Sequence, residues 1–319
     1  METRAHRERR RDFYLDDKGE RAAYVDLQLT PSRLAVLETL AEFRDLNTEM
    51  LYQHVNAKLG RDVHRGWLQN SLTDLRKRAG YLSCYPAQYE TVNADYKELI
   101  YRLTDRGRKF VERKPHISSS SFFHDWMAAH VVASLRLMAH HEQVPFIEPL
   151  EILSRVPALK HPYAFPVELP WNGKTIQHRS SPDYPIFGLN VGEENPLFIW
   201  LEIDCATEDG ESDEVDYSNI TQKIACLHEL TKEKQGDHQF WKRVKLPDIM
   251  FLFITTEKYQ KRAIIESVKR VCGTSPRFLV KTMPHFRRID YTPQPMADLW
   301  YTGWERVGYP PFFFNAKEE

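Results

Sequence analysis

The chain has 319 residues, of which 42% are hydrophobic and 28% are charged, and its formal net charge is −1. These values are typical of a globular protein of about two domains, and its 39 aromatic residues exclude a wholly disordered chain. No apolar run approaches the ~18 residues of a membrane helix, and the charged N-terminal segment excludes a secretory signal peptide. The 4 cysteines form no C-x-x-C pair, which argues against a zinc knuckle and predicts a cytoplasmic protein.

The small net charge hides a difference between the two parts of the chain. Residues 1–115 contain 22 Lys and Arg against 18 Asp and Glu, a net charge of +4. Residues 116–319 contain the remaining 22 against 27, a net charge of −5. This difference favours the first part as the one that meets any nucleic acid.

Changes in composition predict five segments along the chain. They are a basic N-terminal arm (1–26), a helical domain (27–114), a linker (115–121), an α/β domain (122–282) and an aromatic, proline-rich tail (283–319). The linker has the sequence P-H-I-S-S-S-S, which is typical of a flexible connection.

Three helices are predicted at the start of the helical domain. Thr30 before Pro31 is typical of a helix start, and leucines follow at helical spacing. Asn47 begins a second short helix, and Gly60 ends it. A third helix is predicted from about His64 to Arg78, with four apolar residues on its buried side: Trp67, Leu68, Leu72 and Leu75.

A hairpin and a short helix complete this domain. Residues 81–85 and 97–103 read as two strands, and 104–111 opens a helix. Helix, helix, helix, hairpin and helix is the order of a winged helix-turn-helix, and the sequence 103–111 resembles the strand-to-helix exit of bacterial winged-helix regulators. The alternative is a helical bundle with an incidental hairpin.

The third helix of a winged helix-turn-helix enters the major groove of DNA. The predicted base-reading residues on this helix are Gln69, Asn70 and Thr73. The predicted phosphate-contacting residues are Arg65, Arg76, Lys77 and Arg78. An ordinary solvated helix face is the alternative interpretation of these polar residues.

The α/β domain is predicted to begin with a helix over 122–140. A proline-rich stretch over 144–171 is expected to be irregular or to form short strands. Later strands are predicted at 175–178, 183–189, 197–205, 249–255 and 278–282, and helices at 217–234 and 257–272. The strand at 197–205 is apolar enough to be central in a sheet.

Three carboxylates are predicted to meet at one end of this sheet. Asp183 follows Pro182 at the start of one strand, and Glu202 and Asp204 close the next, where their spacing of two puts them on one face. Clustered carboxylates are unfavourable unless they bind a divalent cation or share protons, and oxygen ligands suit Mg²⁺ or Mn²⁺. The alternatives are a turn role for Asp183 and solvated or salt-bridged side chains at the strand end.

This arrangement resembles the restriction-endonuclease-like PD-(D/E)xK fold, in which a helix precedes a meander of three strands, followed by a helix and another strand. The resemblance covers roughly residues 122–282 and rests on Pro182, Asp183, Glu202 and Asp204. The family's lysine would fall at position 204, where this chain has aspartate. Lys223, on the next helix, is the candidate replacement, because some members of the fold carry the lysine there.

Longer strings resemble the replication-relaxation family of bacterial plasmid and mobile-element proteins. They are R-S-S-P-D-Y-P-I-F over 179–187 and F-I-W-L-E-I-D-C-A-T-E over 198–208. Two residues separate Arg179 from Pro182, a departure from the tighter form of the family's motif. The resemblance implies a role in plasmid replication or in DNA relaxation.

Three functions follow as hypotheses. The first is an accessory protein that binds double-stranded DNA through the winged helix and carries a degenerate nuclease-like domain for assembly. The second is a metal-dependent endonuclease, with Mg²⁺ or Mn²⁺ on Asp183, Glu202 and Asp204 and with Lys223 at the phosphate. The third is an adaptor that docks on a relaxase or replication initiator. A homodimer is left open, and no membrane partner is expected.

Overall fold

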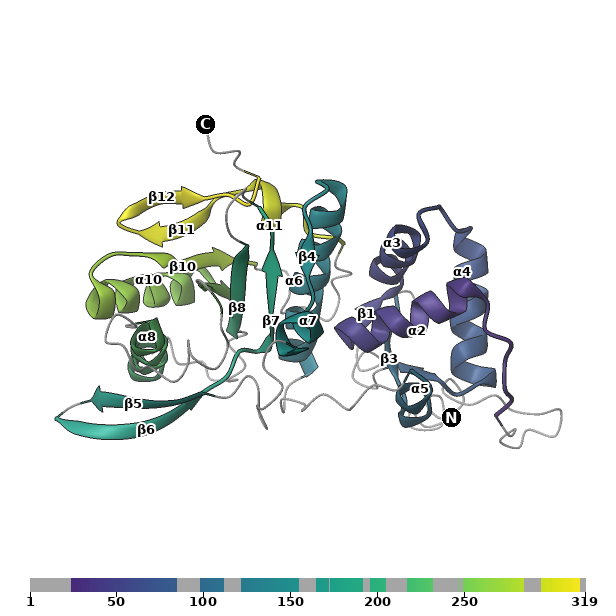
Figure 1. Ribbon diagram of the computed structural model, residues 1–319, viewed down its shortest axis with the longest axis horizontal. Coiled ribbons are helices and arrows are strands. Elements are labelled where there is room, and N and C mark those ends of the chain that lie inside the picture. Colours follow the sequence, from purple (N-terminus) through teal and green to yellow (C-terminus); the bar gives the residue numbers. More distant parts are fainter. Residues whose placement is uncertain are drawn as a thin grey trace, which may run out of the picture. The chain divides into compact units, whose positions relative to one another are not determined.

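The structure is a computed structural model with two compact units (Figure 1). It describes residues 24–84, 98–111, 122–154, 165–171, 173–191, 196–204, 217–231, 246, 249–283 and 294–315. The first unit comprises Met1–Leu137 and Arg288–Met296, and the second comprises Met138–Arg287 and Ala297–Glu319. Both units mix helices and strands, which confirms the α+β class. Among the described residues, no helix has the length and apolar character needed to span a bilayer.

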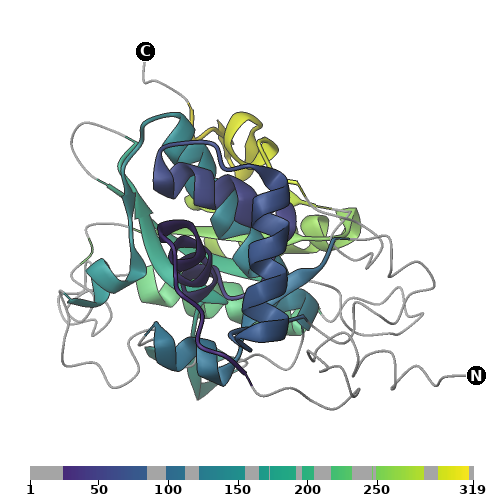
Figure 2. The same ribbon diagram turned by 90° about the vertical axis from the view of Figure 1, so that its right-hand side faces the viewer.

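The first unit combines helices with a small antiparallel sheet of order β1-β3-β2. Its elements are α2 (Pro31–Phe43), β1 (Leu46–Asn47), α3 (Thr48–Leu59), α4 (Arg65–Thr73), the π-helical turn η1 (Asp74–Arg78), β2 (Leu82–Cys84), β3 (Ile100–Leu103), α5 (Asp105–Phe110) and most of α6 (Phe122–His141). Figure 2 shows α4 and η1 as one continuous helix. The order of elements is the one predicted for residues 27–114, with β1 added.

Side-chain caps explain where the first helices begin. The Thr30 hydroxyl accepts a hydrogen bond from the Arg33 amide at 3.4 Å, and the Asn47 side chain accepts one from the Met50 amide at 3.0 Å. These contacts satisfy amide groups that have no partner within the helix. Gly60 ends α3 with a φ of 62°, in the left-handed region that favours glycine. The predicted starts of both helices and the end of α3 are therefore confirmed.

The predicted hairpin is present as β2 and β3, with Leu82 opposite Leu103. Most of its predicted tip lies outside the described residues. The two-residue strand β1, in which Leu46 pairs with Tyr101, was not predicted. Beside it, Arg102 donates two hydrogen bonds, of 2.7 and 2.8 Å, to the fully buried carboxylate of Asp45. This bidentate pair joins β3 to the end of α2.

Helix α6 was predicted to open the α/β domain, but the division between the units falls within it, after Leu137. Its earlier turns bind other helices of the first unit. Asp125 forms an ion pair with Arg44 at 2.7 Å, and Arg136 forms one with Glu42 at 2.6 Å. The predicted linker over 115–121 lies outside the described residues.

The second unit is built on a seven-stranded mixed sheet of order β12-β11-β10-β9-β8-β7-β4. Its elements after α6 are β4 (Phe146–Ile147), α7 (Pro149–Ser154), β5 (Phe165–Trp171), β6 (Lys174–Ser180), β7 (Tyr184–Leu189), β8 (Leu197–Asp204), α8 (Tyr217–Thr231), β9 (Met250–Thr255), α10 (Lys258–Cys272), β10 (Ser275–Thr282), α11 (Asp298–Tyr301), β11 (Trp304–Val307) and β12 (Tyr309–Phe312). Strands β8, β9 and β10 are parallel, and the outer pairs are antiparallel. All six residues of β9 are buried, as expected for a strand covered on both faces.

The strand predicted at 175–178 is present within β6, but it is not part of the main sheet. It pairs only with β5, in a separate two-stranded sheet (Figure 1). Strand β5 contains Pro166 and Pro170, which cannot donate to a ladder and are tolerated where one edge is free. Its alternate residues Val167 and Leu169 are buried in the core with α8. The short strand β4 takes the outer place beside β7 instead.

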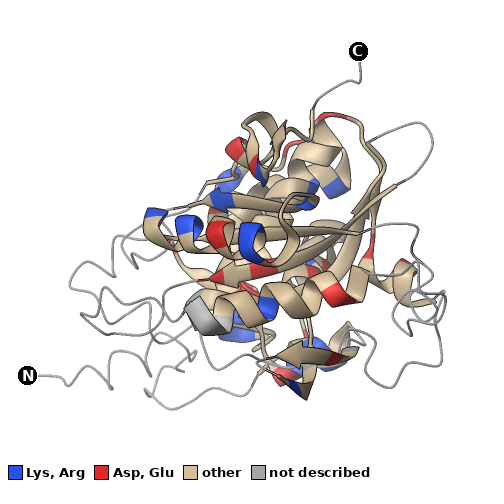
Figure 3. Cartoon of the chain, turned by 90° about the vertical axis from the view of Figure 1, so that its left-hand side faces the viewer, with Lys and Arg blue, Asp and Glu red and all other residues tan. Residues whose placement is uncertain are grey.

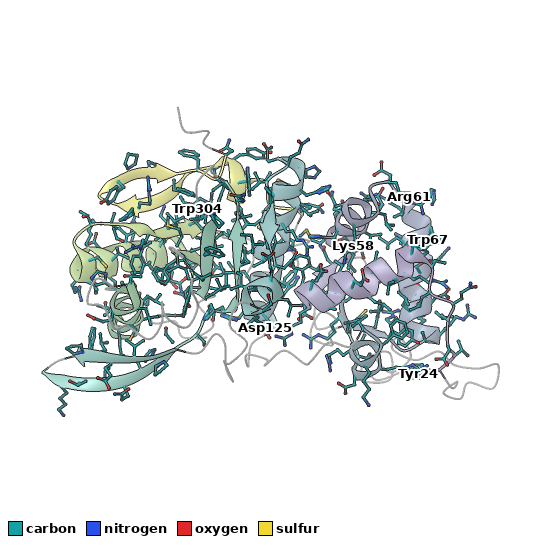
Figure 4. The ribbon with its side chains drawn as sticks, viewed as in Figure 1. Tyr24, Lys58, Arg61, Trp67, Asp125 and Trp304 are labelled. Atoms are coloured by element: carbon teal, nitrogen blue, oxygen red, sulfur yellow. The ribbon has the colours of Figure 1, made fainter. Side chains whose placement is uncertain are left out.

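The segment predicted as an aromatic tail is largely part of the fold. Strand β11 pairs with β10, and β12 pairs with β11, so residues 304–312 widen the main sheet. Trp300 and Trp304 are fully buried, and Phe314 stacks on Trp300 with ring centroids 5.5 Å apart. Trp304, labelled in Figure 4, also donates a hydrogen bond to the Leu299 carbonyl at 2.8 Å. Apolar burial explains why this segment folds back on the sheet.

Candidate functional site

The exposed face of α4 is the first candidate site, and it belongs to the first unit. Leu68, Ser71 and Leu72 are buried on the inner side of the helix. The three predicted base-reading residues, Gln69, Asn70 and Thr73, are all exposed. Trp67, predicted to be buried, is half-buried in the first turn of α4 (labelled in Figure 4).

Two of the predicted phosphate-contacting residues are accessible. Lys77 is partly exposed and has no ion-pair partner among the described residues. The side chain of Arg78 is 49% exposed and forms an ion pair with Asp74 at 3.4 Å. Asp74 also pairs with Arg33 of α2 at 2.7 Å, so this carboxylate has a second cation beside it.

Arg76 was predicted to contact phosphate, and the structure contradicts this. It is buried, and it donates a hydrogen bond to the Cys84 sulfur at 2.9 Å. Arg76 follows Leu72 by four residues, which places both on the inner face of the helix. Its guanidinium therefore links η1 to β2 inside the unit.

Arg65 has an exposed side chain that is already bound within the unit. Its guanidinium donates to both carboxylate oxygens of Glu49 on α3, at 2.5 and 3.1 Å, and lies 4.2 Å from the centre of the Tyr52 ring. The hydrogen bond from Arg65 lowers the pKa of Glu49, because it stabilises the charged carboxylate. Arg65 thus links α4 to α3, and the carboxylate of Glu49 balances its positive charge.

Arg61 is a residue of this surface that the sequence did not single out. It is exposed in the turn between α3 and α4, and it has no ion-pair partner in the described part of the chain (labelled in Figure 4). Its position directly after the helix-ending Gly60, in the turn before α4, was the available signal.

The second candidate site is in the second unit, where the structure brings together the four residues predicted from the motif. Asp183 stands just before β7 and is fixed on the backbone of β8. Its amide donates to the Leu201 carbonyl at 3.0 Å, and its carboxylate accepts a hydrogen bond from the Ile203 amide at 2.7 Å. Asp183 is therefore more than a turn residue, because it is bound to the strand that carries Glu202.

Glu202 is the most buried member of the site, with an exposed fraction of 1%. It shares a face of β8 with Trp200, whose indole N–H donates to its Oε1 at 2.6 Å. Its Oε2 forms an ion pair with the ammonium group of Lys223, on α8. Phe198 and Trp200 pack into the core shared with α8 and α10, so the packing of α8 on β8 positions Lys223 over Glu202.

Asp204 ends β8 and is held by a residue that the sequence did not indicate. Gln260, in the first turn of α10, donates to Asp204 Oδ1 at 3.3 Å and accepts a hydrogen bond from the Thr255 hydroxyl at 2.5 Å. Thr255 lies opposite Asp204 in the parallel pairing of β8 and β9. Gln260 is 56 residues away along the chain, so only the fold brings it here.

Lys223 is paired with Glu202, and the charges of Asp183 and Asp204 also act on its ammonium group. Burial, with the nearby charge of Asp183, raises the pKa of Glu202 to about 8, although Lys223 acts to lower it. Burial acts to lower the pKa of Lys223, but the carboxylates around it outweigh this effect and raise it. Lys223 therefore stays charged near neutral pH, while Glu202 takes up a proton of its own as the pH falls below about 8.

The residues present do not form a ready metal site. Among the described residues, no group of three or more His, Cys, Asp or Glu side chains is arranged to hold a metal ion. Glu202 is engaged by Trp200 and Lys223, and one oxygen of Asp183 is engaged by the Ile203 amide. The ammonium group of Lys223 supplies the positive charge that the sequence assigned to Mg²⁺ or Mn²⁺.

Comparison of the chain with protein-family models, curated proteins and solved structures finds no match.

Proposed function

We propose that this protein binds double-stranded DNA through the exposed face of α4, in the manner of a winged helix-turn-helix. The observation that carries the proposal is the two-sided character of α4. Leu68 and Leu72 anchor one side, while Gln69, Asn70 and Thr73 are exposed on the other. Asn and Gln side chains pair with adenine in the major groove, and Thr contacts bases or the thymine methyl group. The order α2, α3, α4, β2, β3, α5 supports the same interpretation.

The second unit, in this proposal, is a nuclease-like domain that acts in assembly rather than in cleavage. Its support is the order α6, β4, β7, β8, α8, β9 in and around the main sheet, with α7 and the β5–β6 pair inserted between β4 and β7. In this order an antiparallel meander is followed by a helix and a parallel strand. The contacts of Glu202 with Lys223 and Trp200 favour a site without catalysis, because both oxygens of this carboxyl group are already engaged by protein groups. The biological role that we propose is an accessory one in the replication or relaxation of a plasmid or mobile element.

Salt-dependent binding of duplex DNA tests the proposal. Lys77→Ala removes one phosphate contact and should flatten the slope of log Kobs against log salt by about 0.9. Lys174→Ala is the matched control, because Lys174 is exposed on β6 of the second unit and its loss changes the net charge equally. Equal slopes for the wild type and Lys77→Ala would contradict the proposed surface.

A metal-dependent endonuclease is the second candidate function, and the meeting of Asp183, Glu202, Asp204 and Lys223 favours it. The assay is conversion of supercoiled plasmid to nicked or linear DNA with Mg²⁺ or Mn²⁺ present. Cleavage by the wild type that is lost in Asp183→Ala would establish this function. Intact plasmid under both ions would leave the assembly role.

A further inference from the structure

Helix α10 presents a basic face in the unit that has the acidic sequence. At about 100° per residue, Lys258, Arg262 and Lys269 fall within an arc of about 40° on an ideal helix, and Arg270 lies about 80° beyond this arc, on the flank of the helix. All four side chains are exposed. The opposite side of α10 is apolar and buried, with Ala263, Ile264 and Val268 in the core. The helix is thus fixed by its apolar side and displays its basic side.

This concentration of positive charge is local. The described part of the second unit has five exposed Lys and Arg residues, and four of them lie on α10, the fifth being Lys174. Figure 3 shows the basic bands repeating along α10 with one acidic band between them. That acidic residue is Glu266, which pairs with Lys269 at 2.7 Å. The face therefore carries four positive charges and one negative charge.

The positive charges on this face are largely unmatched. Lys258, Arg262 and Arg270 have no ion-pair partner among the described residues. In contrast, Lys261, on the flank of the helix, is paired with Glu305 of β11 at 2.5 Å. A row of unpaired cations on a rigid helix favours a polyanionic partner.

We infer that the exposed face of α10, formed by Lys258, Arg262, Lys269 and Arg270, is a second DNA-binding surface that contacts the phosphate backbone. Arg270 follows Lys258 by twelve residues, which is about 18 Å along the axis of the α-helix. Over the same length of the axis of B-DNA, one strand carries about five phosphates. The face contains no Asn or Gln to read bases, so its contacts are independent of sequence.

The position of this face links it to the carboxylate site. Helix α10 begins where β9 ends, and Gln260 in its first turn holds Asp204. The basic face therefore starts at the same end of the sheet as Asp183, Glu202 and Lys223. The inference rests on the proposed function in one respect, that DNA is the partner.

The test is the salt dependence of duplex binding by the full chain carrying Lys258→Ala, Arg262→Ala and Arg270→Ala together. Loss of three phosphate contacts should flatten the slope by about 2.7, so that from about 50 to about 200 mM salt the wild type loses about 40-fold more affinity than the variant. Glu266→Gln should shift binding in the opposite direction, because it removes the repulsive charge and releases Lys269. Thermal unfolding of each variant checks that the fold is retained.

The outcomes separate this inference from the proposed function. If the triple variant keeps the wild-type slope while Lys77→Ala flattens it, the α10 surface is wrong and the α4 surface stands. If the triple variant flattens the slope and Lys77→Ala does not, the α10 surface stands alone. If the wild type does not bind DNA, both fail, and an acidic protein becomes the partner to seek for α10.

Discussion

Replacing Lys223 with methionine should destabilise the second unit more at about pH 9 than at about pH 6. Removing one partner of a fully buried ion pair costs about 3–5 kcal/mol. Glu202 is 1% exposed, but Lys223 is 38% exposed, so water reaches the pair and we expect about 2 kcal/mol at pH 9. At pH 6 the Glu202 carboxyl holds a proton and needs no counter-charge, and the expected loss is under about 1 kcal/mol.

The sign follows from the raised pKa of Glu202. Between about pH 4.5 and about pH 8, the folded state keeps the proton on Glu202 that the unfolded state has already lost. The contribution of Glu202 to the free energy of unfolding therefore falls as the pH rises through this range. Above pH 8, Lys223 limits the fall because it stabilises the ionised carboxylate. In Lys223→Met this stabilisation is absent, so the pKa of Glu202 is higher than in the wild type. The free energy of unfolding of the variant therefore keeps falling by about 1.4 kcal/mol for each pH unit above the wild-type pKa of Glu202, until the pH reaches the pKa of Glu202 in the variant.

Urea unfolding followed by hydrogen exchange in peptides from β8 and β9 measures this effect in the second unit alone. Lys258→Met is the matched control, because Lys258 is exposed and unpaired among the described residues, and its effect should stay within about 0.5 kcal/mol at both pH values. Equal destabilisation by Lys223→Met at pH 6 and pH 9 would refute the claim that Glu202 takes up a proton between these pH values.

Three further predictions concern single contacts. Asp183→Ala should cost about 1–2 kcal/mol and speed exchange of the Ile203 amide, which loses its acceptor at 2.7 Å, whereas Asp183→Asn should keep most of the protection. Gly107→Ala should destabilise the first unit by about 2 kcal/mol or more in urea, because its Cβ would lie 2.3 Å from the Tyr81 carbonyl oxygen; a cost as small as that of the exposed control Lys109→Ala would argue against this contact. Burial lowers the pKa of His54 to about 3 and that of His130 to about 4, so the first unit should lose stability as the pH falls below about 6.5. His54→Gln should roughly halve this loss between pH 7 and pH 5, and an unchanged loss would show that His54 is not the group that titrates.

The elements that were predicted correctly depend on residues close together in the sequence. Thr30 and Asn47 satisfy amides only three residues away, so the helices they cap were recognisable without the rest of the chain. The same holds for Glu202, which shares a face of β8 with Trp200, as strand periodicity requires. The meeting of Asp183 with this strand followed from a hairpin-like connection between consecutive strands.

Contacts between distant segments explain what the sequence did not reveal. Arg76 was predicted to be a surface cation because arginine is usually exposed. Its hydrogen-bond acceptor, Cys84, lies on another element, so the sequence around Arg76 does not reveal that it is buried. Strand β4 lies beside β7 through backbone hydrogen bonds. Because β4 has only two residues, it shows no alternation of apolar and polar side chains from which a strand could be predicted. Gln260 joins the carboxylate site only because α10 begins where the parallel strand β9 ends.

Photocrosslinking to bromodeoxyuridine-substituted duplex DNA, followed by mass spectrometry of the linked peptides, identifies the segment of the chain that contacts the bases. We expect crosslinks in the peptide that contains Gln69, Asn70 and Thr73, and we expect them to weaken when these three residues are replaced by alanine. Crosslinks confined to other peptides, or undiminished in the alanine variant, would contradict DNA recognition by α4.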